Sequence, residues 1–199
     1  MFGEPERNEK EWGKVKFNQL ANIDRTQALP NEFTKEDVYL GLEDIEKVTG
    51  NIIKTSLENA EELKSSKFRF TTNHILYGKL RPYLNKVAFP VTKGICSTDI
   101  FPIMPLQNIS NKYFIGYLMR SNYFVKQMTL KTVGANLPRA SSDSIQNLKV
   151  YKPPMELQTQ FANIATKAET LKEQYKNSLH ELENLYGSLS QRAFNGELK

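Results

Sequence analysis

A regular apolar stripe in the C-terminal part of the chain constrains its fold more than any other feature. After Pro153 and Pro154, apolar residues recur with the alternating spacing of four and three that marks a heptad seam. The seam positions are Leu157, Phe161, Ile164, Ala168, Leu171, Tyr175, Ser178, Leu182, Leu185 and Leu189. Only Ser178 interrupts the apolar pattern. The spacing predicts one helix over residues 155–191, about 50 Å long at about 1.5 Å per residue.

A helix of this length needs a surface against which to pack its apolar side. Polar residues flank the stripe, which favours a partner helix in a coiled coil. We therefore expect residues 153–199 to form a long coiled-coil helix for dimerisation and subunit docking. The expected dimer contacts are Leu157, Phe161, Ile164, Leu171, Tyr175, Leu182, Leu185 and Leu189. The alternative is a terminal helix that lies along its own domain.

Residues 1–152 carry shorter and more mixed patterns. Apolar and polar residues alternate at 14–17 and 67–70, which predicts β-strands, and further strands are expected at 38–42, 75–77, 86–89 and 100–104. One helix is expected to begin after Ser110 as N-cap, because apolar residues from Tyr113 to Met128 recur on one face. The predicted fold class is α/β, with a globular domain of mixed strands and helices at 1–152 followed by the long helix.

The charge is distributed unevenly along the chain, although the formal net charge is only +5. Residues 1–63 hold 8 Lys and Arg against 14 Asp and Glu, whereas residues 64–152 hold 14 Lys and Arg against two acids, Asp99 and Asp143. An ordinary solvated surface could account for the lysines alone. The near absence of acids favours a polyanion partner, because carboxylates would repel the phosphates that Lys and Arg attract.

The candidate DNA contacts fall in three loops of this basic middle segment. Lys and Arg position a protein on phosphates, while Arg, Lys and Asn also read base edges in the grooves. The candidates are Lys79, Arg81, Lys86, Lys93, Lys131, Asn136 and Arg139. For Gly78 and Arg81 a role in holding the fold competes with a role in binding DNA. Asp99 and Asp143 are interpreted as a turn residue and a helix N-cap.

Few patterns favour catalysis, metal binding or membrane insertion. The sequence has no phosphate-binding glycine loop, and its two histidines, His74 and His180, lie far apart. The single cysteine, Cys96, excludes an intrachain disulfide and a cysteine-based metal cluster. Asp44 with the run 61–64 is the nearest match to a nuclease site, and the match is weak. With no apolar run long enough for a membrane helix, we expect a cytoplasmic protein.

Several segments together resemble one known family. They are residues 78–87 and 96–100, residues 39–45 before Thr49 and Gly50, the proline-containing segment 153–158, and the segments 185–189 and 191–198. These segments resemble the specificity subunits of type I restriction-modification systems, over nearly the whole chain. The family carries two target-recognition domains and two long helices that pair antiparallel, so each domain reads one half of a bipartite DNA target. This chain resembles a half-subunit, with one domain and one helix.

The resemblance also implies a division of labour among subunits. A methyltransferase subunit would methylate adenine with S-adenosylmethionine, and a restriction subunit would use ATP and Mg²⁺ for translocation and cleavage, so this chain would need no cofactor of its own. We therefore expect a non-catalytic recognition subunit whose partners are double-stranded DNA, the methyltransferase and restriction subunits, and a second copy of the chain. The runner-up is a free-standing dimeric nucleic-acid-binding regulator. A metal-dependent nuclease is a third hypothesis.

Overall fold

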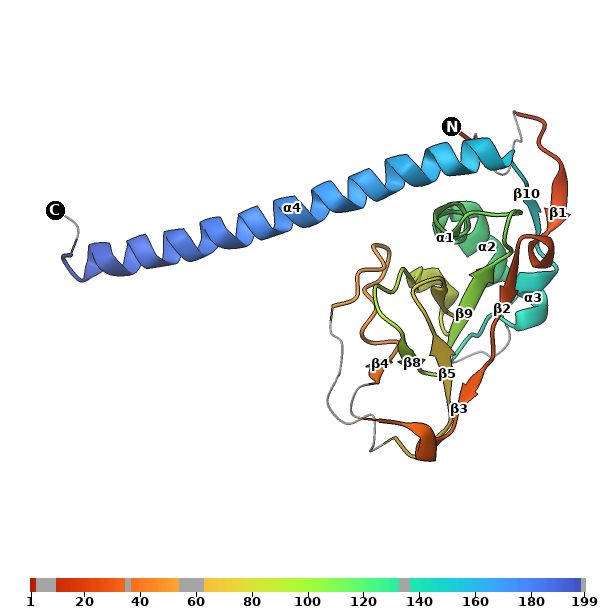
Figure 1. Ribbon diagram of the computed structural model, residues 1–199, viewed down its shortest axis with the longest axis horizontal. Coiled ribbons are helices and arrows are strands. Elements are labelled where there is room, and N and C mark those ends of the chain that lie inside the picture. The colour runs from red at the N-terminus through yellow and green to blue at the C-terminus, as the bar shows by residue number, and fades with distance from the viewer. Residues whose placement is uncertain (3–9, 35–36, 54–62, 133–136, 198–199) are drawn as a thin grey trace. The chain divides into compact units, whose positions relative to one another are not determined.

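A computed structural model describes residues 1–2, 10–34, 37–53, 63–132 and 137–197 (Figure 1), and within these residues the chain forms ten short strands and four α-helices. The strands are β1 (Lys14–Lys16), β2 (Ala21–Ile23), β3 (Gln27–Ala28), β4 (Val38–Leu40), β5 (Lys67–Phe70), β6 (Ile75–Gly78), β7 (Val87–Ala88), β8 (Gly94–Cys96), β9 (Ile100–Pro105) and β10 (Lys149–Tyr151). The α-helices are α1 (Lys112–Arg120), α2 (Asn122–Leu130), α3 (Ser142–Gln146) and α4 (Met155–Phe194), and the short 3-10 helices are η1 (Phe17–Gln19), η2 (Pro30–Glu32) and η4 (Pro82–Leu84). This mixed domain followed by a long helix confirms the predicted fold class.

The chain divides into two units, Met1–Thr159 and Gln160–Lys199, which we call the globular unit and the helix unit. The boundary lies inside α4, a few residues beyond the limit of 152 expected from sequence. Gln158 gives the physical reason, because its side chain is fully buried in the globular unit. Its Nε2 donates to the carbonyl of Pro153 at 2.9 Å, and its Oε1 accepts from the backbone N–H of Asn111 at 2.9 Å. The first turn of α4 is thus fixed to the globular unit.

Three small sheets organise the globular unit. The strand orders are β2-β9-β6-β7, β3-β5-β8-β4 and the pair β1-β10, and every pairing is antiparallel except the parallel pair β4 and β8. The predicted strands at 14–17, 38–42, 67–70, 75–77, 86–89 and 100–104 all overlap strands in the structure. Helix α1 packs against β7 and β9, and α2 packs against η4.

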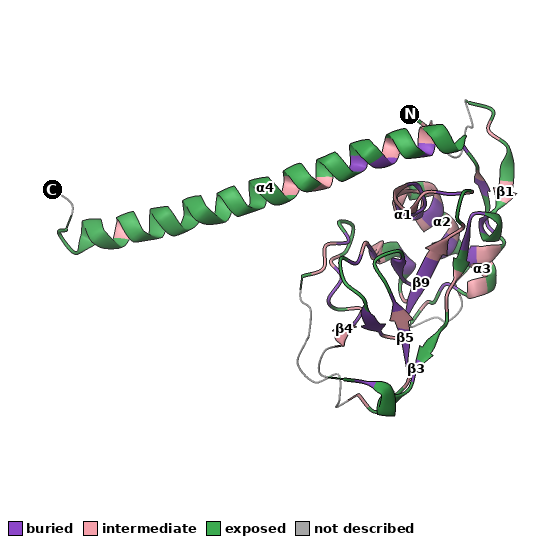
Figure 2. Ribbon diagram, in the orientation of Figure 1, coloured by how far each residue is buried: buried purple, intermediate pink, exposed green. Residues whose placement is uncertain are grey.

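Aromatic side chains fill the core between these elements. Phe124 is fully buried, with its ring centre 5.7 Å from that of Phe17 and 5.8 Å from that of Tyr77. Phe114 on α1 is also buried. In Figure 2 the buried residues gather on the strands and on the short helices of the globular unit. Phe114 and Phe124 of the predicted helix therefore belong to the core.

The helix expected after Ser110 is two helices in the structure. Ser121 separates them: its extended backbone ends α1, and its hydroxyl accepts from the backbone N–H of Phe124 to cap α2. The N-cap of α1 is Asn111, not Ser110, because the Asn111 side chain accepts from the N–H of Tyr113. Ser110 is buried and donates to the carbonyl of Leu20. The capping hydrogen bond of Ser121 thus starts a new helix, although the apolar residues continue at helical spacing through this point.

The N-cap expected at Asp143 is also wrong. Ser141 caps α3, because its hydroxyl accepts from the N–H of Ser144 at 3.0 Å. Asp143 lies in the first turn of that helix, where a negative charge is favourable to the helix dipole. Asp99 lies in a turn before β9, as expected.

Helix α4 continues for 40 residues and makes up most of the helix unit. Its predicted seam side chains are exposed from Ile164 onward, whereas Leu157 and Phe161 are half-buried. Leu182 is 63% exposed and Tyr175 is 73% exposed. Figure 2 shows the same part of α4 as almost wholly exposed. Within the described residues, no helix combines the length and apolar character needed to cross a membrane.

Candidate nucleic-acid interface

Two of the three predicted DNA-binding loops lie together. The segment after β6 and the segment before α3 form an antiparallel bridge between Leu80 and Arg139. The N–H of Arg81 donates to the carbonyl of Pro138 at 2.7 Å, and the N–H of Ala140 donates to the carbonyl of Lys79 at 2.9 Å. These backbone bonds hold Lys79, Arg81 and Arg139 close to one another, although they come from distant parts of the sequence.

Asp99 joins the side chains of this group. Its Oδ1 lies 3.3 Å from Nε of Arg139 and 3.8 Å from Nζ of Lys79. The N–H of Lys79 also donates to the carbonyl of Asp99 at 2.9 Å. Asp99, which the sequence analysis placed in a turn, therefore also holds two of the predicted DNA-binding cations, Lys79 and Arg139, next to each other.

Arg81 serves the fold through its backbone. Its φ of +51° lies in the left-handed region, which is uncommon for a residue other than glycine. It precedes η4, and its carbonyl accepts from the N–H of Leu84. The Arg81 side chain is exposed to solvent. The structural role expected for Arg81 thus involves its backbone, and the side chain stays a predicted DNA contact.

Gly78 permits a close approach of two segments. A Cβ at this position would lie 2.6 Å from Cδ1 of Leu42 and 3.1 Å from Cβ of Lys86. Lys86 itself points toward the same segment, because its ammonium donates to the carbonyl of Leu42 at 2.9 Å. The side chain of Lys86 therefore has a bond within the fold, and its contact with DNA stays a prediction.

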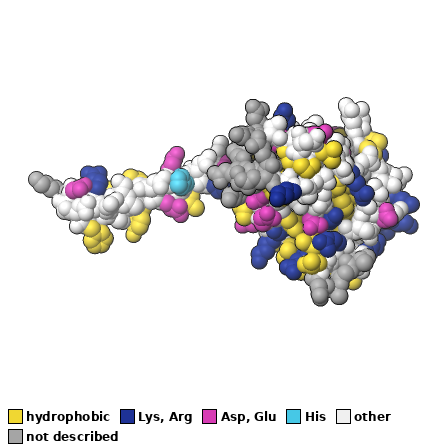
Figure 3. All heavy atoms as spheres, turned by 90° about the horizontal axis from the view of Figure 1, so that it is seen from below, with side chains coloured by type: hydrophobic (Ala, Val, Ile, Leu, Met, Phe, Trp, Pro, Cys, Tyr) yellow, Lys and Arg dark blue, Asp and Glu magenta, His cyan; other side chains and the backbone are white. Residues whose placement is uncertain are grey.

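Two more of the predicted contacts are exposed in other segments. Lys93 is exposed in the loop between β7 and β8, and Lys131 is exposed at the C-terminal end of α2. Asn136 lies outside the described residues. Figure 3 shows Lys and Arg side chains at several places on the visible face of the globular unit, interspersed with Asp and Glu.

One cation near this group was not found from sequence. Arg25 follows β2, and its guanidinium lies 5.5 Å from the centre of the Phe101 ring on β9. Lys79 lies over the same ring at 4.9 Å. Arg25 belongs to the acidic N-terminal part of the sequence, so no charge pattern marks it. Only the pairing of β2 with β9 brings it to Lys79.

The residues considered for catalysis have structural partners. Asp44 is buried, and its Oδ2 accepts from the N–H of Gly41 at 2.7 Å, so it closes a turn. Residues 61 and 62 of the weak nuclease match lie outside the described residues. His180 is exposed on α4 beside Asn184, with 3.2 Å between their side-chain nitrogens. Within the described part of the chain, no group of three or more His, Cys, Asp or Glu side chains could hold a metal ion.

The buried His74 and the half-buried Asp24 form a pair that fixes the turn before β6. The N–H of Thr71 donates to Nδ1 of His74 at 2.9 Å, and Nε2 lies 3.2 Å from Oδ2 of Asp24. Burial would raise the pKa of Asp24, but hydrogen bonds from Thr26 and the contact with His74 outweigh it and lower that pKa below its ordinary value.

Burial raises the pKa of the Cys96 thiol, so the thiolate form is disfavoured.

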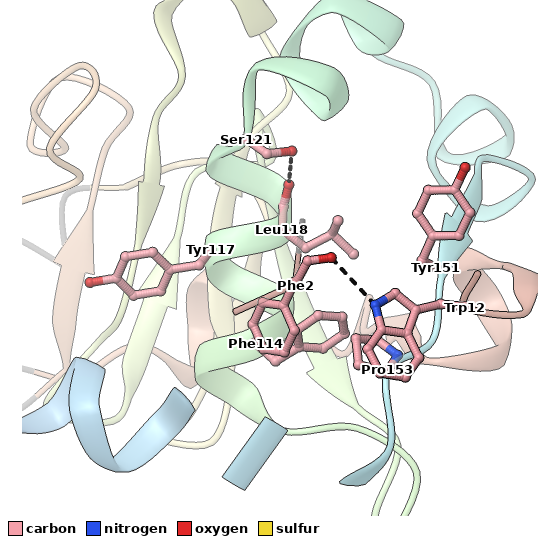
Figure 4. Close-up of a pocket in the computed structure, with 8 residues that line it drawn as sticks. All are labelled: Phe2, Trp12, Phe114, Tyr117, Leu118, Ser121, Tyr151 and Pro153. Carbon is pink, nitrogen blue, oxygen red and sulfur yellow. Dashed lines mark hydrogen bonds between the residues drawn. The ribbon is translucent and has the colours of Figure 1, made fainter. Parts of the chain in front are cut away.

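An aromatic pocket of about 180 Å³ lies in the globular unit (Figure 4). It is lined by Phe2, Trp12, Phe114, Tyr117, Leu118, Ser121, Tyr151 and Pro153. The indole N–H of Trp12 donates to the carbonyl of Phe2 at 3.3 Å, and the Ser121 hydroxyl donates to that of Leu118 at 2.6 Å. These lining residues are mostly aromatic, and Tyr117, Ser121 and Tyr151 contribute hydroxyl groups.

The family described as "Type I restriction modification DNA specificity domain" matches residues 9–184. The chain therefore belongs to this family of type I restriction-modification systems, which confirms the resemblance noted in its sequence.

Individual relatives agree with the family. The chain is 29% identical over 193 residues to the type I restriction enzyme EcoDI specificity subunit of Escherichia coli, covering 94% of this chain and 42% of that protein. The HsdS subunit from Thermoanaerobacter tengcongensis matches with a TM-score of 0.67 and 22% identity, over 81% of this chain and 43% of that one. The type I S subunit from M. genitalium matches with a TM-score of 0.64 and 15% identity, over 94% and 47%. The chain thus spans less than half the length of these relatives, and the solved structures establish the fold.

Proposed function

We propose that the chain reads one half of a bipartite double-stranded DNA target and docks the methyltransferase and restriction subunits of a type I system. The observation that carries this proposal is the family match over residues 9–184, which includes nearly all of the globular unit and most of α4. The family match favours this function over a free-standing nucleic-acid-binding regulator. The full-length relatives are longer than this chain, so their activity is transferred to it only as a proposal.

The basic loops support the DNA-binding part of the proposal. Lys79, Arg81 and Arg139 are held together by backbone hydrogen bonds, and the side chains of Arg81 and Arg139 are exposed. Exposed cations on a fixed backbone attract phosphates and orient a protein on the duplex. Lys93 is exposed in the loop between β7 and β8 and Lys131 is exposed at the C-terminal end of α2, and both extend the proposed contact with DNA.

The chain itself catalyses no reaction in this proposal. S-adenosylmethionine, ATP and Mg²⁺ belong to the partner subunits, which carry out methylation and cleavage. Asp44 and His74, which could have served a catalytic site, are buried and used in turns.

We further propose that two copies pair antiparallel through α4. The exposed seam of the helix unit supports this, because Leu171, Leu182 and Leu185 are each more than half exposed. A heptad stripe of this kind is stabilised by a partner helix. Two-fold pairing would present two identical globular units, so the DNA target would consist of identical inverted half-sites separated by a spacer.

Mapping methylated DNA tests the recognition function. The chain is expressed with a type I methyltransferase subunit, and the methylated adenines are located by sequencing. We expect one recurrent motif with two inverted half-sites, and loss of that motif when the chain is omitted. Methylation without a recurrent motif would contradict the proposal. Cleavage of DNA by the purified chain with a divalent metal alone would instead favour a nuclease.

Light scattering at tens of micromolar tests the antiparallel pair. We expect a dimer for the unmodified chain, and monomers with a folded globular unit for Leu171→Gln and Leu182→Gln. Asn177→Gln is the matched control, because it places the same side chain on α4 away from the seam. A monomeric unmodified chain, or crosslinks between parallel helices, would contradict this arrangement.

A further inference from the structure

Two cations that follow separate strands, Arg25 after β2 and Lys79 after β6, lie over the ring of Phe101. Phe101 is 5% exposed, and its ring centre lies 5.5 Å from the guanidinium of Arg25 and 4.9 Å from the ammonium of Lys79. Both distances lie within the range of a cation–aromatic contact. The N–H of Asp24 donates to the carbonyl of Pro102 at 2.8 Å, which fixes the backbone beside Arg25 to β9.

Asp99 links a third cation, Arg139, to Lys79. Its carboxylate lies within 3.8 Å of Lys79 and 3.3 Å of Arg139. Lys79 therefore contacts both the carboxylate of Asp99 and the ring of Phe101, while Arg139 pairs with that carboxylate and Arg25 lies over that ring. Within the described part of the chain, no carboxylate forms an ion pair with Arg25. The group of four charged residues thus keeps an excess of positive charge.

The cations are fixed at their backbones and open to solvent at their side chains. Arg25 is exposed, and the Arg139 and Lys79 side chains are 45% and 21% exposed. Their strands and loops are joined by the backbone bonds of β2 to β9 and of Lys79 to Asp99 and Ala140. An incoming anion would therefore find cations that need little reordering, which reduces the entropic cost of binding.

We propose that Arg25, Lys79 and Arg139 form a contact site for phosphates of the DNA backbone, and that Asp99 limits its strength. The proposal rests on the DNA-binding function proposed above. Asp99 neutralises part of the charge and repels an incoming phosphate, so it weakens affinity for any DNA. Because phosphate contacts carry no sequence information, this restraint leaves a larger share of the affinity to contacts that read bases.

Arg25→Gln tests the site, with binding to target duplex measured by fluorescence anisotropy over a salt series on the complex with the methyltransferase subunit. The slope of log K against log salt is negative, and loss of one phosphate contact makes it shallower by about 0.9. The same loss lowers the affinity for DNA roughly eightfold at about 0.1 M salt. Arg25→Lys keeps the charge and should keep the slope. An unchanged slope in folded Arg25→Gln would overturn the site.

Lys14→Gln is the matched control for a general charge effect. Lys14 also lies over an aromatic ring, 5.2 Å from the centre of Tyr151, but on the separate β1-β10 sheet. We expect its substitution to leave the salt slope unchanged. An equal fall in slope for Lys14→Gln and Arg25→Gln would mean that total charge, not this site, governs binding, and would overturn the proposal.

Asp99→Asn tests whether Asp99 weakens the affinity for DNA, and it should raise that affinity, whereas Arg25→Gln should lower it. The Asn side chain keeps the shape of Asp and leaves its backbone bonds intact, so the turn should be retained. We expect affinity to rise by up to about fivefold for target and non-target duplexes alike, the factor that corresponds to one exposed ion pair. An unchanged or lower affinity for non-target duplex would refute the role of Asp99.

The outcomes separate this inference from the function on which it rests. If the unmodified complex shows no preference for any target, the proposed function fails. If it prefers its target and Arg25→Gln keeps both affinity and salt slope, only the phosphate site fails.

Discussion

The two units of the chain place their apolar side chains in opposite environments. In the globular unit, Phe17 and Phe124 are fully buried, whereas Leu182 and Tyr186 in the helix unit are 63% and 75% exposed. Both segments carry apolar patterns of the kind that drives folding, but the helix unit leaves its large apolar side chains exposed from Ile164 onward, although Ala162 and Ala165 are buried. The difference indicates that the globular unit is stabilised by its own core, and that the apolar side of α4 is available for a partner.

Truncating one large apolar side chain in each unit gives the largest test of this comparison. Phe124→Ala should lower the free energy of unfolding by about 3–5 kcal/mol, because it removes a buried ring that packs against Phe17 and Tyr77. Leu182→Ala should change the unfolding of the globular unit by less than about 0.5 kcal/mol. Urea titration followed by the fluorescence of Trp12, the single tryptophan, reports on the globular unit. Equal losses in the two variants would break the comparison.

One glycine in each unit gives a second test, with opposite signs. Gly50 has a φ of +67°, and a Cβ there would meet the carbonyl oxygen of Val87 and Nη2 of Arg120. Arg120 donates to that same carbonyl through Nε and Nη2, at 3.1 and 2.7 Å. Gly50→Ala should therefore destabilise the globular unit by about 2–3 kcal/mol, measured by urea titration with Trp12 fluorescence.

Gly187 is the counterpart of Gly50 in the helix unit. It lies on α4 away from the seam, and a Cβ there would meet nothing within 4 Å. Gly187→Ala should stabilise the helix by about 0.5–1 kcal/mol, because alanine loses less backbone entropy than glycine in a helix. Thermal melting followed by far-ultraviolet circular dichroism measures this effect. A loss of helix stability would mean that Gly187 has a contact that α4 alone does not reveal.

The smallest expected effect is a dependence on pH confined to the globular unit. Asp24 has a lowered pKa when folded, so its contribution to stability is present above its unfolded pKa of about 3.9 and is lost as the pH falls through the folded value. Asp24→Asn should cost below about 1 kcal/mol at neutral pH, since the carboxylate is partly exposed, and the cost should vanish in acid. Urea titrations at neutral and acid pH measure it, with Glu181→Gln on α4 as a control. A cost that stayed constant with pH would contradict the assignment.

Local patterns predicted the regular elements well. Alternation at 14–17 and 67–70 placed β1 and β5, and the heptad spacing placed α4 to within a few residues. These patterns depend on neighbours within a few positions, so the sequence carries them directly. The single helix expected after Ser110 failed because the side-chain bond of Ser121 ends one helix and begins another, and an apolar period does not register such a cap.

By itself, the sequence determined the mixed strand and helix domain, the long amphipathic helix, the basic middle segment and the family. Only the tertiary structure decided how individual cations are used. Lys86 donates to a carbonyl within the fold, Lys79 and Arg139 share Asp99, and Arg25 joins them over Phe101. These groupings depend on the pairing of β2 with β9 and on the bridge from Leu80 to Arg139. Such contacts join segments distant in sequence through backbone hydrogen bonds, and no local period or charge count encodes which segments will meet.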